Sequence, residues 1–323
     1  MEKDLHEKQP DEFRKTDQRK SNSGSIREAM TEVKVNKLLD LQDPLWGFEN
    51  LHSLNEREKL RELINKIKIE EYVPTYGKKY ELESSTQQFD HVLFESDPLQ
   101  SLMKNFDDIN FIQFIGNLLY QSNTNIIDHL EYHDILNESN KYTFIEDLAS
   151  QKYKIQPNLG IGRNLGFNQW RKATFFNKEQ LKKLILSEKF IPYYPTLTIS
   201  RIDHGGFIAP HTDMSEKIAS FMIYLPENKE ESDSSLGTTF WKPKPLNSNR
   251  AYVQDIATAN QHLTGEKFKE FIKKYYPIRT KFQNKYTLLF FRSNTSWHSF
   301  EYNKKDFGPR LSINVNFMFP MTK

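Results

Sequence analysis

Residues 310–317 alternate strictly between polar and apolar side chains. The polar members are Arg310, Ser312, Asn314 and Asn316, and the apolar members are Leu311, Ile313, Val315 and Phe317. Side chains two positions apart in a strand point to the same face of the sheet. The segment therefore predicts a strand whose polar face lines a cavity, while its apolar face packs outward against helices such as residues 177–188.

Other segments of the second half have the same strand character. Alternation or short apolar runs predict strands over residues 196–200, 218–225, 238–241 and 286–291, and one inserted amphipathic helix opens at Thr264. The first half instead shows helical spacing of apolar residues, which predicts helices from Asn55, after Pro98, and over residues 111–119 and 144–148. No internal repeat is visible, so the sequence does not favour a propeller or a solenoid.

The composition is that of a globular protein whose net charge produces no strong electrostatic field. The chain has 323 residues, with 24 phenylalanines, 15 tyrosines and 4 tryptophans to build a core. Its formal net charge of +2 gives no reason to expect nucleic acid as a partner. No apolar run approaches the roughly 20 residues of a membrane span, and no secretory signal is present, so we expect a cytoplasmic protein without a membrane span.

The chain divides by composition into three parts. Residues 1–36 are rich in charge and poor in apolar side chains, which predicts a disordered N-terminal arm. Residues 37–155 are predicted to form a mostly helical N-terminal region, and residues 156–323 the strand-rich domain. The glycine-containing residues 160–166 lack the spacing and the preceding strand of a nucleotide-binding loop, so we interpret them as a turn.

The chain contains no cysteine, so a metal ion must be held by His, Asp or Glu. His211 and Asp213 are two positions apart in an extended segment and can hold one ion together. His298 follows the apolar run 288–291 after a short turn. A second pair of this spacing, His129 and Glu131, lies in a helical segment where such positions diverge, and it is interpreted as surface helix.

Two imidazoles and one carboxylate on one face of an iron(II) ion leave three coordination positions open, as in non-haem iron oxygenases. Two of these positions can take a 2-oxo acid and the third can take dioxygen. Arg310, at the start of a neighbouring strand, can grip a distal carboxylate with two parallel hydrogen bonds, and Ser312 can add a third. Two alternatives are open. One is that these residues are polar strand ends that hold no metal, and the other is a zinc hydrolase that uses the same ligands.

In these residues the chain resembles the 2-oxoglutarate and Fe(II)-dependent dioxygenases, and among them the prolyl-4-hydroxylase-like branch. The resemblance covers residues 194–319. The family pattern R-Y-x-x-G-x-x-x-x-x-H-x-D is matched from Arg201 through Gly205 to His211 and Asp213, except that Ile202 stands where tyrosine is common. Residues 237–240 are similar to the family's G-x-T-x-F strand, and Arg310 stands where many members have lysine.

The resemblance implies a double-stranded β-helix, a jelly roll of two packed sheets, with the helical N-terminal region bracing it. It implies Fe(II) on His211, Asp213 and His298, with 2-oxoglutarate and O2 as co-substrates and ascorbate as a supporting reductant. It places 2-oxoglutarate on Arg310 and Ser312, and Tyr224 is a further candidate for contact with it. The implied reaction is hydroxylation of an unactivated C–H bond, with release of succinate and CO2.

The sequence does not identify the prime substrate, because relatives of one fold act on very different compounds. We expect a small molecule, namely an amino acid, a sugar or a lipid-linked compound. A protein (prolyl) hydroxylase and a jelly-roll binding protein with a vestigial metal site are the alternatives. The oligomeric state is left open by the sequence.

Overall fold

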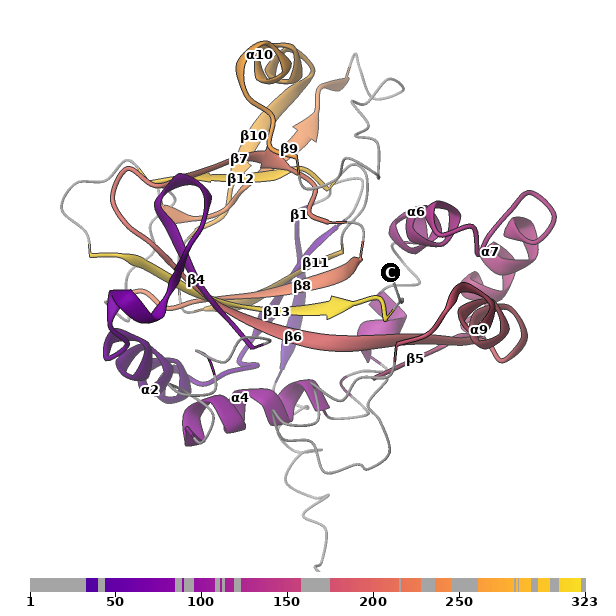
Figure 1. Cartoon of the computed structure of the whole chain (residues 1–323), viewed down its shortest axis with the longest axis horizontal. Helices are drawn as coiled ribbons and strands as arrows, with labels where there is room; N and C mark the ends of the chain where they lie inside the picture. The colour runs from indigo at the N-terminus through magenta and orange to yellow at the C-terminus, as the bar shows by residue number, and fades with distance from the viewer. Residues whose placement is uncertain are drawn as a thin grey trace, which may run out of the picture. The chain divides into compact units, whose positions relative to one another are not determined.

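Two β-sheets face each other across a cavity, and helices lie outside them (Figure 1). The computed structural model describes residues 33–39, 44–84, 89, 96–107, 111, 114–118, 123–157, 175–214, 216–227, 236–245, 261–281, 283, 285–291, 296–302 and 308–320. Residues 1–32 and 160–166, for which an arm and a turn were predicted, lie outside this part of the chain.

The larger sheet has nine strands, eight of which pair antiparallel in one path. Their order is β1 (Lys34–Leu39), β2 (Leu45–Glu49), β11 (Tyr286–Phe291), β8 (Lys217–Tyr224), β13 (Arg310–Met318), β6 (Phe190–Ile202), β4 (Lys79–Glu83) and β3 (Val73–Pro74). The ninth strand, β5 (Lys154–Pro157), pairs parallel with β6. The smaller sheet has the order β10 (Tyr275–Arg279), β9 (Thr239–Pro243), β12 (His298–Glu301) and β7 (Phe207–His211).

From β6 onward the chain crosses repeatedly between the two sheets. The strands β6, β8, β11 and β13 belong to the larger sheet, and β7, β9, β10 and β12 to the smaller one. Each sheet therefore contributes one wall of the same cavity. The predicted strands of the second half are confirmed, and β13 carries the predicted polar row on the cavity side.

The outer face of the larger sheet is apolar and is covered by aromatic side chains. Phe221 of β8 lies 5.3 Å from Phe317 of β13, measured between ring centroids. On its other side Phe221 lies 4.9 Å from Phe106, which belongs to a helix of the first half, and Phe48 of β2 lies 5.9 Å away. Aromatic pairs at these separations stabilise the layer beyond simple burial. The helix that carries Phe106 thus contacts the sheet through this cluster.

The described helices are mostly short. They are α2 (Leu54–Asn65), α4 (Asp97–Asp107), α6 (Asn123–Tyr132), α7 (Lys141–Ala149), α9 (Lys178–Lys182) and α10 (Gly265–Lys274), with 3-10 turns at Ile69–Glu71 and Tyr76–Lys78 and a π-turn at Lys183–Ser187. Figure 1 shows α10 beyond the smaller sheet and α4 beside the larger one. Among the described residues, no helix has the length and apolar character needed to cross a membrane.

The helix predicted from Asn55 begins slightly earlier, because Ser53 caps it. The Ser53 hydroxyl accepts the backbone N–H of Glu56 at 3.2 Å, and the Glu56 carboxylate accepts the backbone N–H of Ser53 at 2.7 Å. This reciprocal capping box satisfies two donors that a helix start leaves open. Asn55 therefore lies inside the first turn of α2.

Besides its helices, the described first half contains short strands that the sequence did not predict. β1 begins at Lys34, so the end of the range assigned to the disordered arm forms a strand. β2 lies between β1 and β11 and is buried on both faces, so it shows no alternation of polar and apolar residues. β4 has only five residues. Strands of this kind give no periodic signal.

Candidate metal site and cavity

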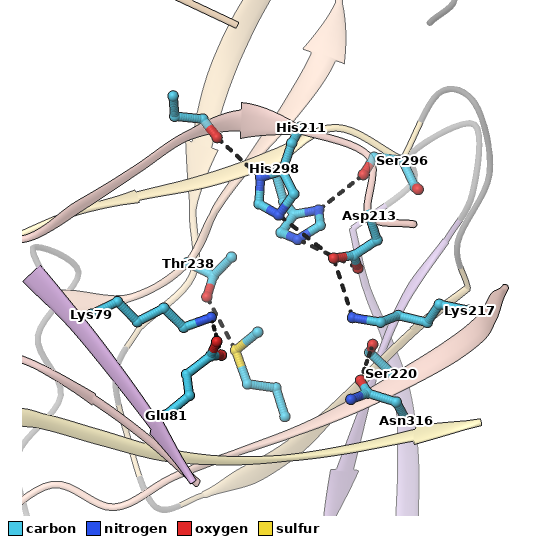
Figure 2. Close-up of polar contacts among 12 residues, drawn as sticks. Lys79, Glu81, His211, Asp213, Lys217, Ser220, Thr238, Ser296, His298 and Asn316 are labelled. Carbon is cyan, nitrogen blue, oxygen red and sulfur yellow. Dashed lines mark hydrogen bonds and ion pairs between the residues drawn. The ribbon is translucent and has the colours of Figure 1, made fainter. Parts of the chain in front are cut away.

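Two histidines from different strands meet at one edge of the smaller sheet. β7 ends at His211 and β12 starts at His298, and the antiparallel register pairs these two residues directly. Their ring centroids lie 4.3 Å apart. With Asp213, which follows β7, they offer three possible ligand atoms that all lie within 4.8 Å of one another. Figure 2 shows the three side chains converging on one point.

A local backbone turn brings Asp213 back towards the histidines. Its φ is +66°, in the left-handed region that aspartate tolerates better than most side chains. One carboxylate oxygen lies 3.5 Å from His211 Nε2 and the other lies 3.7 Å from His298 Nε2. A non-glycine residue held in this conformation marks a site where the surrounding structure fixes the geometry.

Backbone carbonyls orient both imidazoles from behind. His211 Nδ1 donates to the carbonyl of Ala209 at 3.0 Å, and His298 Nδ1 donates to the carbonyl of Ser296 at 3.1 Å. Because a carbonyl only accepts, each Nδ1 carries the proton and each Nε2 keeps its lone pair for a ligand. Burial, with a further contribution from His211, lowers the pKa of His298 to about 3, so this ring is neutral.

Asp213 is ionised in this setting. Burial opposes ionisation, but the Lys217 ammonium, 3.2 Å from Oδ1, holds the pKa of Asp213 well below its usual value. Two imidazole Nε2 atoms and one carboxylate form a donor set that suits a divalent first-row metal ion. The residues present therefore fit an iron(II) ion.

The three side chains border a cavity of about 770 Å³ that lies between the two sheets. Its walls include the predicted polar row of β13, namely Arg310, Ser312, Asn314 and Asn316. This volume lies in the range typical of small-molecule sites. The structure thus brings the predicted ligands and the predicted anchor, Arg310, into one cavity.

Arg310 is buried, with 4% of its surface exposed, and its guanidinium is held by neutral groups. Nε donates to the carbonyl of Leu236 at 2.8 Å, and the terminal nitrogens donate to the hydroxyls of Ser312 and Thr238, both at 3.3 Å. Burial lowers the pKa of Arg310, but an arginine stays charged under ordinary conditions. The cavity therefore has one cationic end, whose guanidinium is held by hydrogen bonds.

Tyr224 lies beneath Arg310 and does not line this cavity. Its ring centroid is 5.0 Å from the Arg310 guanidinium carbon, and Phe300 lies at 4.2 Å. The Tyr224 hydroxyl donates to Thr238 Oγ1 at 2.8 Å and accepts the backbone N–H of Thr238 at 3.0 Å. The phenol is thus engaged with the protein, and its contact with a co-substrate stays a prediction.

Two charged or titratable neighbours of the triad were not predicted. His262 lies 4.7 Å from His211 between ring centroids, and burial, with a contribution from His211, lowers its pKa to about 4. No motif surrounds His262, so nothing in the sequence signals its position. Lys217 was placed in a strand, and its spacing of four residues from Asp213 was the available signal. The side chain of His129, which belongs to α6, lies outside the described side chains.

The amino-acid sequence matches no family model and none of the curated proteins compared with it. Solved structures do show similarity. A prolyl-4-hydroxylase from Pseudomonas putida has 8% sequence identity and a TM-score of 0.39, and covers 91% of this chain and 98% of its own. The non-heme α-ketoglutarate-dependent epimerase SnoN from nogalamycin biosynthesis has 12% identity and a TM-score of 0.39, covering 86% and 79%. HygX from Streptomyces hygroscopicus, with nickel, 2-oxoglutarate and hygromycin B bound, has 10% identity and a TM-score of 0.36, covering 85% and 82%.

The case for function in this chain rests on its own residues, namely the converging His211, Asp213 and His298 and the buried Arg310 in the same cavity.

Proposed function

We propose that the chain is a non-haem Fe(II) and 2-oxoglutarate-dependent oxygenase with a double-stranded β-helix core. The observation that carries the proposal is the convergence of His211, Asp213 and His298 on one point beside a cavity that also contains Arg310. A facial set of two histidines and one carboxylate leaves coordination positions open for a 2-oxo acid and dioxygen. The crossing of the chain between two antiparallel sheets supports the β-helix assignment.

The metal would be held by the Nε2 atoms of His211 and His298 and by the carboxylate of Asp213. Hydrogen bonds from both Nδ1 atoms to backbone carbonyls keep these ligands oriented and in the right tautomer. When bound, iron supplies the oxygen chemistry, in which oxidative decarboxylation of 2-oxoglutarate to succinate and CO2 accompanies hydroxylation of a C–H bond. The protein's part is to bind, orient and exclude water.

Arg310 and Ser312 would hold the distal carboxylate of 2-oxoglutarate. The guanidinium packs against the rings of Phe300 and Tyr224, and Nε donates a hydrogen bond to the Leu236 carbonyl. A planar, pre-oriented guanidinium binds a carboxylate through two parallel hydrogen bonds. Tyr224 acts in this proposal as a positioning residue that supports Arg310. The prime substrate is proposed to be a small molecule that enters the remaining part of the cavity.

The proposal is tested by anaerobic addition of Fe(II) and 2-oxoglutarate, followed by measurement of the weak visible charge-transfer band of the chelate. Wild-type protein should develop the band and, after admission of oxygen, release succinate. Alanine at His211, Asp213 or His298 should abolish both signals while the circular dichroism spectrum is retained. His204→Ala is the matched control, because His204 is exposed and lies outside the triad.

A folded wild-type protein that gives no chelate band would contradict the proposal. Wild-type succinate formation in any of the three triad variants at limiting iron would show that the ligand assignment is wrong.

A further inference from the structure

The cavity side of the larger sheet carries a continuous polar surface beyond the Arg310 end. We call it the polar floor, and its members are Glu83, Thr196, Thr198, Ser220, Asn314 and Asn316. The strand registers arrange them in two rows across β4, β6, β13 and β8. One row joins Glu83, Thr198 and Asn314, and the other joins Thr196, Asn316 and Ser220.

The polar character of the floor belongs to one face of the sheet only. On the opposite face the same two central strands carry fully buried Leu197, Ile199, Ile313 and Val315. Thr198, Ser220 and Asn316 are buried, Thr196 and Asn314 are partly buried, and Glu83 is exposed, so the floor runs from the interior to the mouth of the cavity. The inner face of packed sheets normally interdigitates apolar side chains into a core. In this protein the inner face of the larger sheet carries hydroxyl and amide groups in place of apolar side chains, and these groups border a cavity of about 770 Å³.

The hydrogen-bonding capacity of the floor is only partly used by the protein. Ser220 donates to the side-chain oxygen of Asn316 at 2.7 Å. The side-chain oxygen of Asn314 is enclosed and has no hydrogen-bond partner among the described residues. Buried polar groups normally have partners, because an unmade hydrogen bond in a dry site is costly. The Asn314 amide, which lines the cavity, therefore has capacity for a ligand.

The floor faces the reaction centre. In Figure 2, Ser220 and Asn316 lie across the cavity from His211, Asp213 and His298, which come from the smaller sheet. A molecule resting on the floor thus lies between the floor and the metal ligands. Arg310 and Ser312 occupy the neighbouring row positions on β13, so the floor is separate from the proposed 2-oxoglutarate anchor.

Two exposed aromatic side chains complete the lining. Tyr76 is 44% exposed and Phe175 is 47% exposed, and both border the cavity. Phe175 packs against Tyr194 with ring centroids 5.1 Å apart. Tyr194 pairs with Met318, one row beyond Asn316, so this aromatic pair lies next to the floor. Aromatic faces pack well against the C–H faces of a sugar ring, whose edges carry hydroxyl groups.

We propose that the polar floor binds a hydroxyl-rich prime substrate, namely a sugar or cyclitol ring. The proposal rests on the proposed function for the identity of the reaction and deepens it by naming the substrate class. Each ring hydroxyl donates and accepts, as do the serine and threonine hydroxyls and the asparagine amides, while Glu83 accepts only. An acyl chain or an apolar polyketide on this floor leaves those groups unpaired, so the floor discriminates against such compounds.

The test uses saturation-transfer difference NMR on the full chain with Mn(II) and 2-oxoglutarate. The probes are glucose, glucosamine, sucrose and myo-inositol, and octanoate and N-acetylprolinamide are the comparison compounds. We expect at least one of the four polyhydroxylated probes to bind and both comparison compounds to fail. Asn314→Leu and Thr198→Val should weaken that binding at least tenfold, whereas Asn65→Leu on the exposed side of α2 should leave it unchanged.

Thr198→Ser keeps the hydroxyl and should retain most of the affinity, which separates hydrogen bonding from packing if Asn314→Leu fails to fold. The inference is overturned if none of the four polyhydroxylated probes binds. It is also overturned if binding is unchanged in Asn314→Leu and Thr198→Val, or if octanoate binds more tightly than the polyhydroxylated probes. Binding of Mn(II) and 2-oxoglutarate is measured in the same samples by relaxation enhancement. Its loss with retained probe binding would contradict the proposed reaction but not the polar floor.

Discussion

Replacing Arg310 by alanine gives the sharpest test of the co-substrate site. Arg310 is only 4% exposed, so a carboxylate paired with it is poorly screened by water. A hydrogen bond to a charged group contributes about 1.5–3 kcal/mol, so the loss of a bidentate contact costs about 3 kcal/mol or more. Since 1.4 kcal/mol corresponds to a factor of ten, the affinity for 2-oxoglutarate should fall at least roughly a hundredfold.

The measurement is anaerobic calorimetric titration of 2-oxoglutarate into the Mn(II)-loaded protein. Affinity for the metal should hardly change in Arg310→Ala, because Arg310 is not a ligand, and Arg310→Lys should recover part of the loss. Pyruvate, which lacks the distal carboxylate, should bind weakly to wild type and lose little further in Arg310→Ala. Arg201→Ala is the control, because Arg201 forms an ion pair with Asp203 at 2.9 Å and lies outside the cavity lining.

The reasoning would be refuted by a folded Arg310→Ala variant that binds 2-oxoglutarate with wild-type affinity. If that variant also fails to process its prime substrate, Arg310 belongs to the substrate and not to the co-substrate. Removal of the side chain also leaves the Leu236 carbonyl without the Nε donor, so a moderate loss of thermal stability is expected. Titrations are therefore made well below the melting transition.

Three further predictions concern stability. Tyr224→Phe removes the acceptor of the buried Thr238 N–H, so the free energy of unfolding measured in urea should fall by about 1–3 kcal/mol. The affinity for 2-oxoglutarate should change less than about threefold. A larger change would place the phenol at the co-substrate. In Gly237→Ala the new Cβ would lie 1.7 Å from the carbonyl oxygen of Thr280, so the backbone must shift, and a loss of about 1–3 kcal/mol or more is expected; wild-type stability would contradict the packing. Burial holds the pKa of His52 well below 6.5, so below that pH only the unfolded state gains this proton and stability falls as pH decreases. Relative to His52→Gln, wild type should lose about 2 kcal/mol between pH 7 and pH 5, and parallel urea-midpoint curves would contradict this.

The strands around the cavity were predictable for two reasons. Some of them alternate between polar and apolar side chains, and the others are short apolar runs with clear ends. β13 is the clearest case, since its polar row faces the cavity and its apolar row faces the aromatic layer. The metal ligands were predictable for a related reason. His211 and Asp213 follow an extended segment, and His298 follows an apolar strand, so both histidines were expected at strand ends.

The first half was less predictable because its strands depend on partners far away in the chain. β2 forms ladder hydrogen bonds with β11, which lies more than two hundred residues later in the sequence, and β4 pairs with β6. No local pattern encodes such a pairing when the strand is short or buried on both faces. Tertiary packing therefore decided the conformation of these segments.

Tyr224 and Asn314 show where the two-residue alternation of side chains along a strand stops being informative. Both belong to strands whose faces follow from alternation; Asn314 was predicted to face the cavity, and Tyr224 was a candidate for contact with 2-oxoglutarate. The Tyr224 hydroxyl bonds to Thr238 at the start of the other sheet, a contact that arises only when the two sheets pack. The side-chain oxygen of Asn314 meets no such partner among the described residues, although the residue lines the cavity. Alternation assigns a side chain to a face, whereas packing across the sheets decides whether its polar end is satisfied by the protein or is left for a substrate.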